Sequence, residues 1–177
     1  MLDQIASQTP SPNPASILTR LDALIRNRLK GGSDSDQPSE GMDVALCQWF
    51  PNKKTLIYAG AKRPLYLVRS QSDPPTLEEV KGDNRAIGGF TRSNSTIYEN
   101  KTCQVSSGDM IYLTTDGFAD QNDRNNKKYG SKALKSLLVQ IATWDIASQR
   151  DALVHELNRH MGRESQRDDI TLIGIRL

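Results

Sequence analysis

The hydrophobic periodicity changes along this chain, and the order of the changes limits the folds that it can adopt. Apolar residues recur at helical spacing over 14–29, alternate with polar residues through much of 43–115, and return to helical spacing over 133–160. Residues 170–177 are again strand-like. A run of strands with segregated helices is typical of α+β domains. We therefore predict antiparallel β-structure flanked by helices, and not a doubly wound α/β fold.

Turn and cap residues divide this pattern into elements. Asn13 can cap the first helix and Pro14 can begin it, whereas Gly31 and Gly32 can end it. The expected strands are 43–50, 55–59, 64–69, 77–80, 96–105, 109–115 and 170–177, and the expected later helices are 133–141 and 147–160. The apolar stripe of the first helix includes Leu24, and that of the last helix includes Val154.

Length and composition favour one ordinary soluble domain. We expect a polar segment at residues 1–12 followed by one domain at 13–177. A net charge of +2 gives no reason to expect nucleic acid or an anionic membrane as a partner. No apolar run approaches the ~20 residues of a membrane span, and the N-terminus lacks the core of a signal peptide, so a cytoplasmic location is expected. Cys47 and Cys103 are expected to be reduced core residues.

Two acidic positions stand at the ends of apolar strands. Asp116 follows the segment IYLTT and precedes Gly117, which allows a sharp turn, and Asp168 and Asp169 precede the segment ITLIGI. If these strands are neighbours, their carboxylates meet and repel each other unless a cation neutralises them. Magnesium and manganese prefer such oxygen ligands. The pattern indicates a metal site, although aspartate at a strand end is also a common turn residue or helix cap.

Several segments together resemble one protein family. They resemble, in order, segments of the type 2C metal-dependent Ser/Thr phosphatases, and most closely the bacterial branch that includes stage II sporulation protein E. The segments are 41–47 (GMDVALC), 56–61 (LIYAGA) with 64–65 (PL), 87–89 (IGG), 115–120 (TDGFAD) with 128–130 (KYG), and 166–171 (QRDDIT). Because they occur in the family's order over about residues 14–177, they are more specific than either aspartate alone.

The resemblance implies a β-sandwich flanked by helices, with divalent ions, Mn²⁺ or Mg²⁺, at one end. It implies an enzyme that hydrolyses phosphoserine or phosphothreonine by attack of a metal-activated water, without a nucleophilic side chain. By motif position, Asp116 and Asp168 would be metal ligands, and Gly117 would serve the turn or offer its carbonyl through water. Asp169 matches a position often held by asparagine.

Three further residues are candidates on their position alone. Asp120 follows the site segment and could act through water, and Asp43 begins a strand that could approach the site. The alternative for Asp43 is an ordinary polar strand start. Arg63, in a hairpin turn, could bind substrate phosphate, or be only a solvated cation.

The sequence also departs from the family pattern. It has no match to the family's N-terminal strand, whose aspartate bridges two metal ions, so the resemblance predicts an N-terminally incomplete domain holding one ion through Asp116, Asp168 and waters. The alternatives are a non-catalytic phosphatase-like signalling domain, an inactive fragment, or an unrelated α+β binding domain. Expected partners are a phosphorylated protein such as a sigma-factor-antagonist-type regulator and an upstream sensor domain or chain. An uncovered sheet edge would favour self-association.

Overall fold

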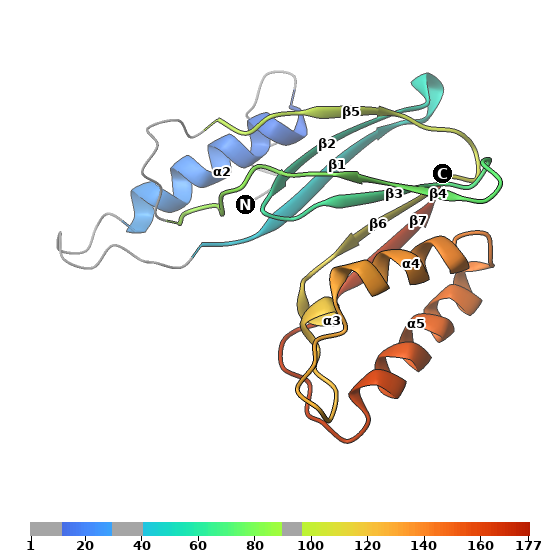
Figure 1. The fold of residues 1–177 in the computed structure, drawn as a ribbon. Coiled ribbons are helices and arrows are strands. Elements are labelled where there is room, and N and C mark those ends of the chain that lie inside the picture. Colours follow the sequence, from blue (N-terminus) through green and yellow to red (C-terminus); the bar gives the residue numbers. More distant parts are fainter. Residues whose placement is uncertain (1–11, 30–40, 90–96) are drawn as a thin grey trace. The chain divides into compact units, whose positions relative to one another are not determined.

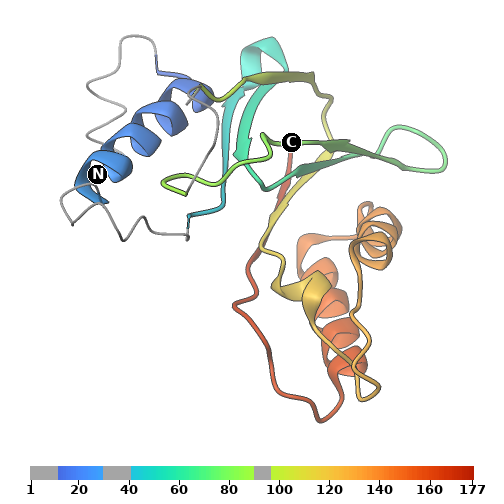
Figure 2. The same cartoon turned by 60° about the vertical axis from the view of Figure 1, so that its left-hand side comes forward.

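A computed structural model describes residues 12–29, 41–89 and 97–177. The chain divides into two compact units, each with its own sheet (Figures 1 and 2). The first unit comprises Met1–Leu65 and Val80–Val105, and the second comprises Tyr66–Glu79 and Ser106–Leu177. No helix within the described ranges is long and apolar enough to cross a membrane.

The first unit is a three-stranded antiparallel sheet beside one helix. Its sheet has the order β1-β2-β5, and α2 packs against β2 (Figure 1). Leu18 and Leu21 of α2 are buried with Ala59 of β2 in the core of this unit. The elements are α2 (Pro14–Leu29), β1 (Val44–Phe50), the 3₁₀ turn η1 (Pro51–Lys53), β2 (Thr55–Ala61) and β5 (Lys101–Gln104).

Polar contacts hold α2 at its start and at its middle. The Asn13 side chain accepts a hydrogen bond from the Ser16 amide at 3.0 Å, which confirms the predicted cap. Asp22 is buried and accepts a hydrogen bond from the Gly88 amide at 2.7 Å. The Arg26 guanidinium donates to the same carboxylate at 2.8 Å. Asp22 thereby ties the helix to the glycine-containing loop at 87–89.

The second unit is a four-stranded sheet that carries the remaining helices. Its strand order is β4-β3-β6-β7. Tyr66, Met110 and Tyr112 from the strands are buried with Leu134 and Leu138 from a helix. The elements are β3 (Leu65–Arg69), β4 (Thr76–Val80), β6 (Met110–Thr114), α3 (Gly117–Asp120), α4 (Ser131–Ile141), α5 (Ile146–Met161) and β7 (Leu172–Arg176).

The predicted fold class, antiparallel sheets flanked by helices, is confirmed, and most of the predicted elements are present. The strand predicted at 96–105 is wrong in length, because β5 covers only Lys101–Gln104 and Ile97 is exposed. Two inward-facing predictions are also wrong: Leu24 is 39% exposed and Val154 is 52% exposed. The predicted ends at Gly31 and Gly32 lie outside the described residues.

The cysteines match their expected character. Both are free thiols, Cys103 is buried and Cys47 is half-buried. Burial, with a smaller contribution from Cys103, raises the pKa of the Cys47 thiol to about 12. Cys47 therefore stays protonated at neutral pH and packs as a small apolar residue.

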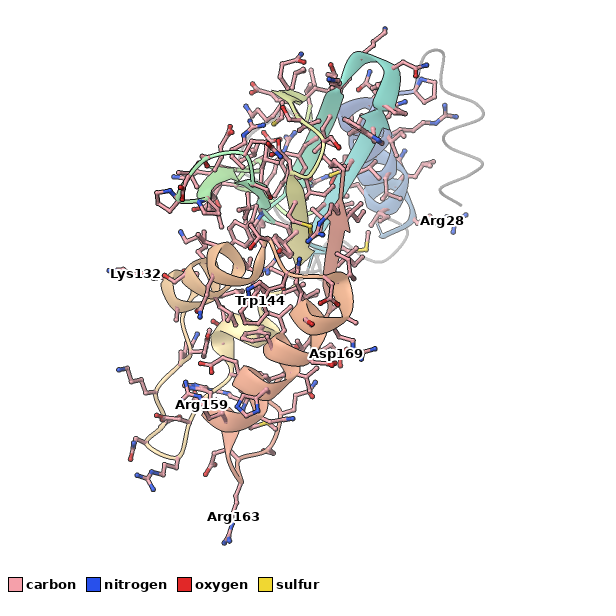
Figure 3. All side chains as sticks on the ribbon, turned by 90° about the vertical axis from the view of Figure 1, so that its right-hand side faces the viewer. Arg28, Lys132, Trp144, Arg159, Arg163 and Asp169 are labelled. Atoms are coloured by element: carbon pink, nitrogen blue, oxygen red, sulfur yellow. The ribbon has the colours of Figure 1, made fainter. Side chains whose placement is uncertain are left out.

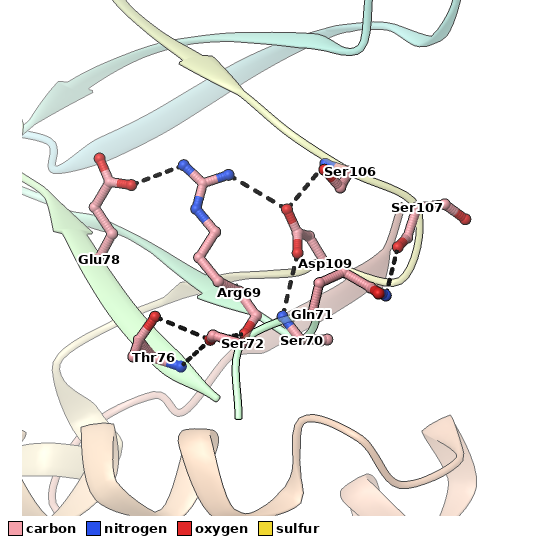
Figure 4. A network of polar contacts seen from close by, with 9 residues as sticks. All are labelled: Arg69, Ser70, Gln71, Ser72, Thr76, Glu78, Ser106, Ser107 and Asp109. Carbon is pink, nitrogen blue, oxygen red and sulfur yellow. Dashed lines mark hydrogen bonds and ion pairs between the residues drawn. The ribbon is translucent and has the colours of Figure 1, made fainter. Parts of the chain in front are cut away.

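A buried carboxylate organises the loops at one end of the second sheet (Figure 4). Asp109, only 1% exposed, accepts hydrogen bonds from the backbone amides of Ser70 at 3.2 Å and Ser106 at 2.9 Å. The Arg69 guanidinium lies 3.3 Å from the same carboxylate and also pairs with the more exposed Glu78 at 2.9 Å. A buried charge is stable only when its partners are in place, so Asp109 fixes the loops before β6 and after β3.

We expect Asp109→Ala to lower the free energy of unfolding by about 2–3 kcal/mol, because two partly buried amides and Arg69 lose their buried acceptor. The matched control is Glu78→Ala, which removes the exposed partner of the same guanidinium and should cost less than about 1 kcal/mol. Urea denaturation followed by circular dichroism measures both. Equal losses in the two variants would contradict the role assigned to Asp109.

Strand β7, at the edge of the second sheet, leads us to expect self-association. β7 is the last strand in the order of this sheet, and its Ile173 and Ile175 are 50% and 45% exposed. Exposed apolar edge strands pair readily with other chains. We expect concentration-dependent association in sedimentation velocity, and its reduction by Ile175→Lys but not by the helical control Val154→Lys. A monomer at all concentrations would refute this.

Candidate functional site

Pairing of β6 with β7 brings the two predicted aspartate segments to the same end of the second sheet. The strands are antiparallel, in a register that places Thr114 opposite Leu172. The Thr115 amide continues the ladder by donating to the Thr171 carbonyl at 3.0 Å. Asp116 follows β6 at the end where Asp168 and Asp169 precede β7. The condition on which the sequence argument depends, that these two strands are neighbours, is therefore met.

Side-chain contacts of Thr115 strengthen this junction. Its hydroxyl donates to the Asp169 carbonyl at 2.9 Å and accepts from the Thr171 amide at 3.0 Å. A threonine hydroxyl can do both at once because it has one donor hydrogen and two lone pairs. The backbone on either side of Ile170 is thus held to the residue that precedes Asp116.

Gly117 allows the closest approach between the two segments. A Cβ atom at this position would lie 2.5 Å from the Asp169 carbonyl oxygen and 3.0 Å from the carbonyl carbon. Any side chain would therefore push the segments apart. The glycine after Asp116 is required by this contact and not by a left-handed turn, because Gly117 begins α3 and its φ is not positive.

Asp116 occupies the cap position of α3 without acting as a side-chain cap. Its backbone carbonyl accepts from the Asp120 amide at 2.8 Å, but its carboxylate makes no capping hydrogen bond. Asp116 is exposed at the surface. The Asp116 carboxylate therefore does not cap α3, which was the main alternative to its being a metal ligand.

The other acidic candidates near this junction are also exposed or half-buried. One carboxylate oxygen of Asp168 accepts from the Asp169 amide at 2.7 Å, and Asp168 is exposed. Asp169 is exposed (Figure 3). Asp120 forms an ion pair with Lys128 at 2.9 Å, so its charge is already balanced by a neighbour.

Asp43 and Arg63 lie in the first unit and contact each other. The Asp43 carboxylate accepts from Arg63 Nη2 at 2.6 Å and from Nε at 3.0 Å. An arginine–carboxylate pair of this kind fixes both side chains. The structure thus joins two residues that the sequence analysis had assigned to different tasks, one near the metal and one at the substrate phosphate.

The donor set can be compared with the needs of a divalent ion. Within the described ranges no three histidine, cysteine, aspartate or glutamate side chains gather into a group that could hold a metal. Two carboxylates at one sheet end, supplemented by backbone carbonyls and waters, suit a hard ion that keeps several waters, as magnesium does. The carboxylate segments at this junction are of the chemical kind that such an ion prefers.

A cationic hollow of about 720 Å³ lies at the C-terminal end of α5. Arg124, Arg159 and Arg163 line it together with Asp123 and Glu164. Arg163 points away from the end of the helix (Figure 3), and Arg159 pairs with Glu156 at 2.6 Å. Exposed cations that are solvated or paired do not by themselves make a phosphate site.

Gln121 is a residue near this junction that sequence reasoning missed. It directly follows the TDGFAD segment and is fully buried. Its side chain contacts Ser165 and Arg167, which lie far along the chain, so no local sequence pattern predicts these contacts. The only feature of the sequence that could have pointed to Gln121 is its position directly after the predicted site segment.

Solved structures with the same fold are phosphatase domains. The SiaA-PP2C domain of Pseudomonas aeruginosa is 31% identical with a TM-score of 0.83, over 99% of this chain and 65% of that one. The PP2C phosphatase domain of SpoIIE from Bacillus subtilis, solved with a fragment of its regulatory domain, is 14% identical with a TM-score of 0.73, over 99% and 47%. RsbX in complex with magnesium is 14% identical with a TM-score of 0.60, over 98% and 69%.

The fold is therefore that of the PP2C-type Ser/Thr phosphatase domains. The sequence profile of the stage II sporulation protein E family matches residues 1–177, and the chain belongs to this family. No curated protein sequence matches the chain. The chain spans 65% of the length of the SiaA domain structure and 47% of the SpoIIE structure.

We expect Gly117→Ala to destabilise the protein by about 1–3 kcal/mol, because the new methyl group meets the Asp169 carbonyl. The control is Gly89→Ala, whose added Cβ would have ordinary contacts of 3.5 Å or more. Urea denaturation gives the stability, and amide hydrogen exchange at 169–171 shows whether the junction opens. Unchanged exchange at 169–171 would contradict the close approach.

Proposed function

We propose that this chain carries the metal-dependent site of a Ser/Thr phosphoprotein phosphatase. Membership of the SpoIIE family and the PP2C fold support the reaction class. The observation that carries the proposal is the junction of β6 and β7, which sets the Asp116 and Asp168 segments side by side on a rigid sheet end. Carboxylates at the mouth of buried strands are held by the sheet and still reach solvent.

Asp116 and Asp168 would hold the ion, Mn²⁺ or Mg²⁺, with water and the Gly117 carbonyl as further donors. The magnesium complex of RsbX supports a divalent ion in this fold. When bound, such an ion supplies Lewis-acid chemistry, activating water and neutralising charge on the phosphoryl oxygens. Thr115 positions the Asp168–Asp169 turn against Asp116. Asp169 and Asp120 would contact the site through water.

The proposed substrate is phosphoserine or phosphothreonine on a bacterial signalling protein in the cytoplasm. The proposed substrate protein is a sigma-factor-antagonist-type regulator, and an upstream sensor domain or chain is proposed to control the phosphatase. The Asp43 carboxylate already accepts from Nε and Nη2 of Arg63, so this edge of the guanidinium is engaged and is not offered to a substrate phosphate. We therefore expect Arg63 to contribute less than the two aspartates.

The test is manganese-dependent hydrolysis of an aryl phosphate and of a phosphoserine peptide. We expect Asp168→Asn and Asp116→Asn to lower activity by about 100-fold or more, because each removes a charged oxygen ligand. Both variants should keep the wild-type unfolding curve. Asp151→Asn, an exposed carboxylate of α5, is the matched control and should retain activity.

A second candidate function, a phosphatase-like signalling domain without catalysis, is favoured by one observation. The described residues contain no group of three metal-ligating side chains. A folded wild-type chain that neither binds manganese nor hydrolyses either substrate would establish this alternative and refute the catalytic proposal. Activity that survives in Asp168→Asn would instead refute the assigned ligands.

A further inference from the structure

The buried side chain of Gln121 contacts the backbone just before Asp168. Its Nε2 donates to the Ser165 carbonyl at 3.1 Å, and its Oε1 accepts from the Arg167 amide at 3.3 Å. Nε2 also donates to the Asn122 carbonyl at 3.2 Å. The Gln121 side chain is 0% exposed, so leaving its amide without partners would be costly.

The two contacts with the 165–167 segment follow the pattern of a parallel strand pair. In such a pair one residue bonds to the carbonyl before and the amide after its neighbour. Here the side-chain amide of Gln121 bonds to Ser165 and Arg167, on either side of Gln166. A single glutamine thus serves as a strand partner for a segment that belongs to no regular element.

Together with Thr115, Gln121 holds alternate residues of the whole segment before β7. Gln121 bonds to Ser165 and Arg167, and Thr115 bonds to Asp169 and Thr171. Asp168 lies between the two sets of contacts. Both anchors come from the short stretch that also contains Asp116, so the position of Asp168 is set from the Asp116 side.

Gln121 is itself held in place by its own backbone. Its carbonyl accepts from the Tyr129 amide at 2.9 Å and lies 3.1 Å from His160 Nε2. The Tyr129 ring meets Phe118 and His160 edge-on, with centroids 5.1 Å apart in each pair. A glutamine whose main chain is held in this way loses less freedom when its side chain bonds to the segment.

We infer that Gln121 is a positioning residue, which holds the 165–167 backbone so that Asp168 stands beside Asp116 in the geometry that an ion requires. The effect on metal binding rests on the proposed function, whereas the effect on the 165–167 backbone rests only on the contacts of Gln121. Residues that orient ligands typically change metal affinity by about 10- to 100-fold when replaced.

Gln149 provides a matched control within the same unit. It is also buried, at 3% exposure, and its Nε2 donates to the carbonyls of Ala142 at 3.2 Å and Trp144 at 2.9 Å. Its Oε1 accepts from the Tyr112 hydroxyl at 2.7 Å. Gln149→Met therefore removes comparable buried bonds, but from residues outside the aspartate junction.

The experiment compares wild type, Gln121→Met and Gln149→Met in two measurements. Amide hydrogen exchange without metal reports the order of residues 165–171, and electron paramagnetic resonance of added Mn²⁺ reports binding. We expect Gln121→Met to speed exchange at 165–171 and to weaken Mn²⁺ binding by about tenfold or more relative to Gln149→Met. Gln149→Met should speed exchange around 142–149 instead.

Each outcome decides the inference. Exchange at 165–171 that is no faster in Gln121→Met than in Gln149→Met overturns it, and so does faster exchange with equal Mn²⁺ affinity in the two variants. Faster exchange in Gln121→Met while the wild type binds no Mn²⁺ supports the positioning role and refutes the proposed function. The two failures are thereby distinguished.

Discussion

The pairing of β6 with β7 is the interaction on which the rest of the second unit depends. It is a short antiparallel ladder between strands that lie far apart in the sequence, and its register decides which residues meet at the sheet end. A shift by one residue would turn Tyr112 out of the core and would separate Thr115 from Asp169 and Thr171. The candidate site therefore inherits its geometry from core packing, because the same alternation that buries the strands also aligns the aspartate segments.

Buried polar side chains recur wherever irregular backbone meets a regular element. Asp22 joins a helix to the loop at 87–89, Asp109 joins two loops beside β6, and Gln121 joins a turn to the segment before β7. In each place the side chain satisfies backbone groups that no strand or helix reaches. Such groups would otherwise be costly to bury. The carboxylates proposed to bind an ion are of the opposite kind, since Asp116 and Asp168 are exposed at the surface.

Sequence reasoning recovered what depends on local pattern and missed what depends on distant contacts. The strand ends at Asp116 and Asp168 were predictable because an apolar run stops there, and Asn13 was predictable as a cap because its partner is three residues away. Val154 was predicted to face inward because periodicity identifies an apolar stripe without showing whether anything covers it. Gln121 escaped prediction because its partners, Ser165 and Arg167, are brought to it only by the helices between them. The metal-ligand roles themselves remain predictions.

The three helices α3, α4 and α5 are inserted between β6 and β7, and this has a consequence for how the site comes into being. The chain must complete the whole helical excursion before the aspartate segments can meet, so loop-closure entropy opposes the site until α5 has docked. In the native protein the same connection means that a change in α5 affects the segment before β7. A partial opening of α5 would slacken residues 162–169 while the sheet persisted, at a lower free energy than global unfolding. On warming, the chain would therefore lose the geometry of the proposed metal site while most of its secondary structure was still intact.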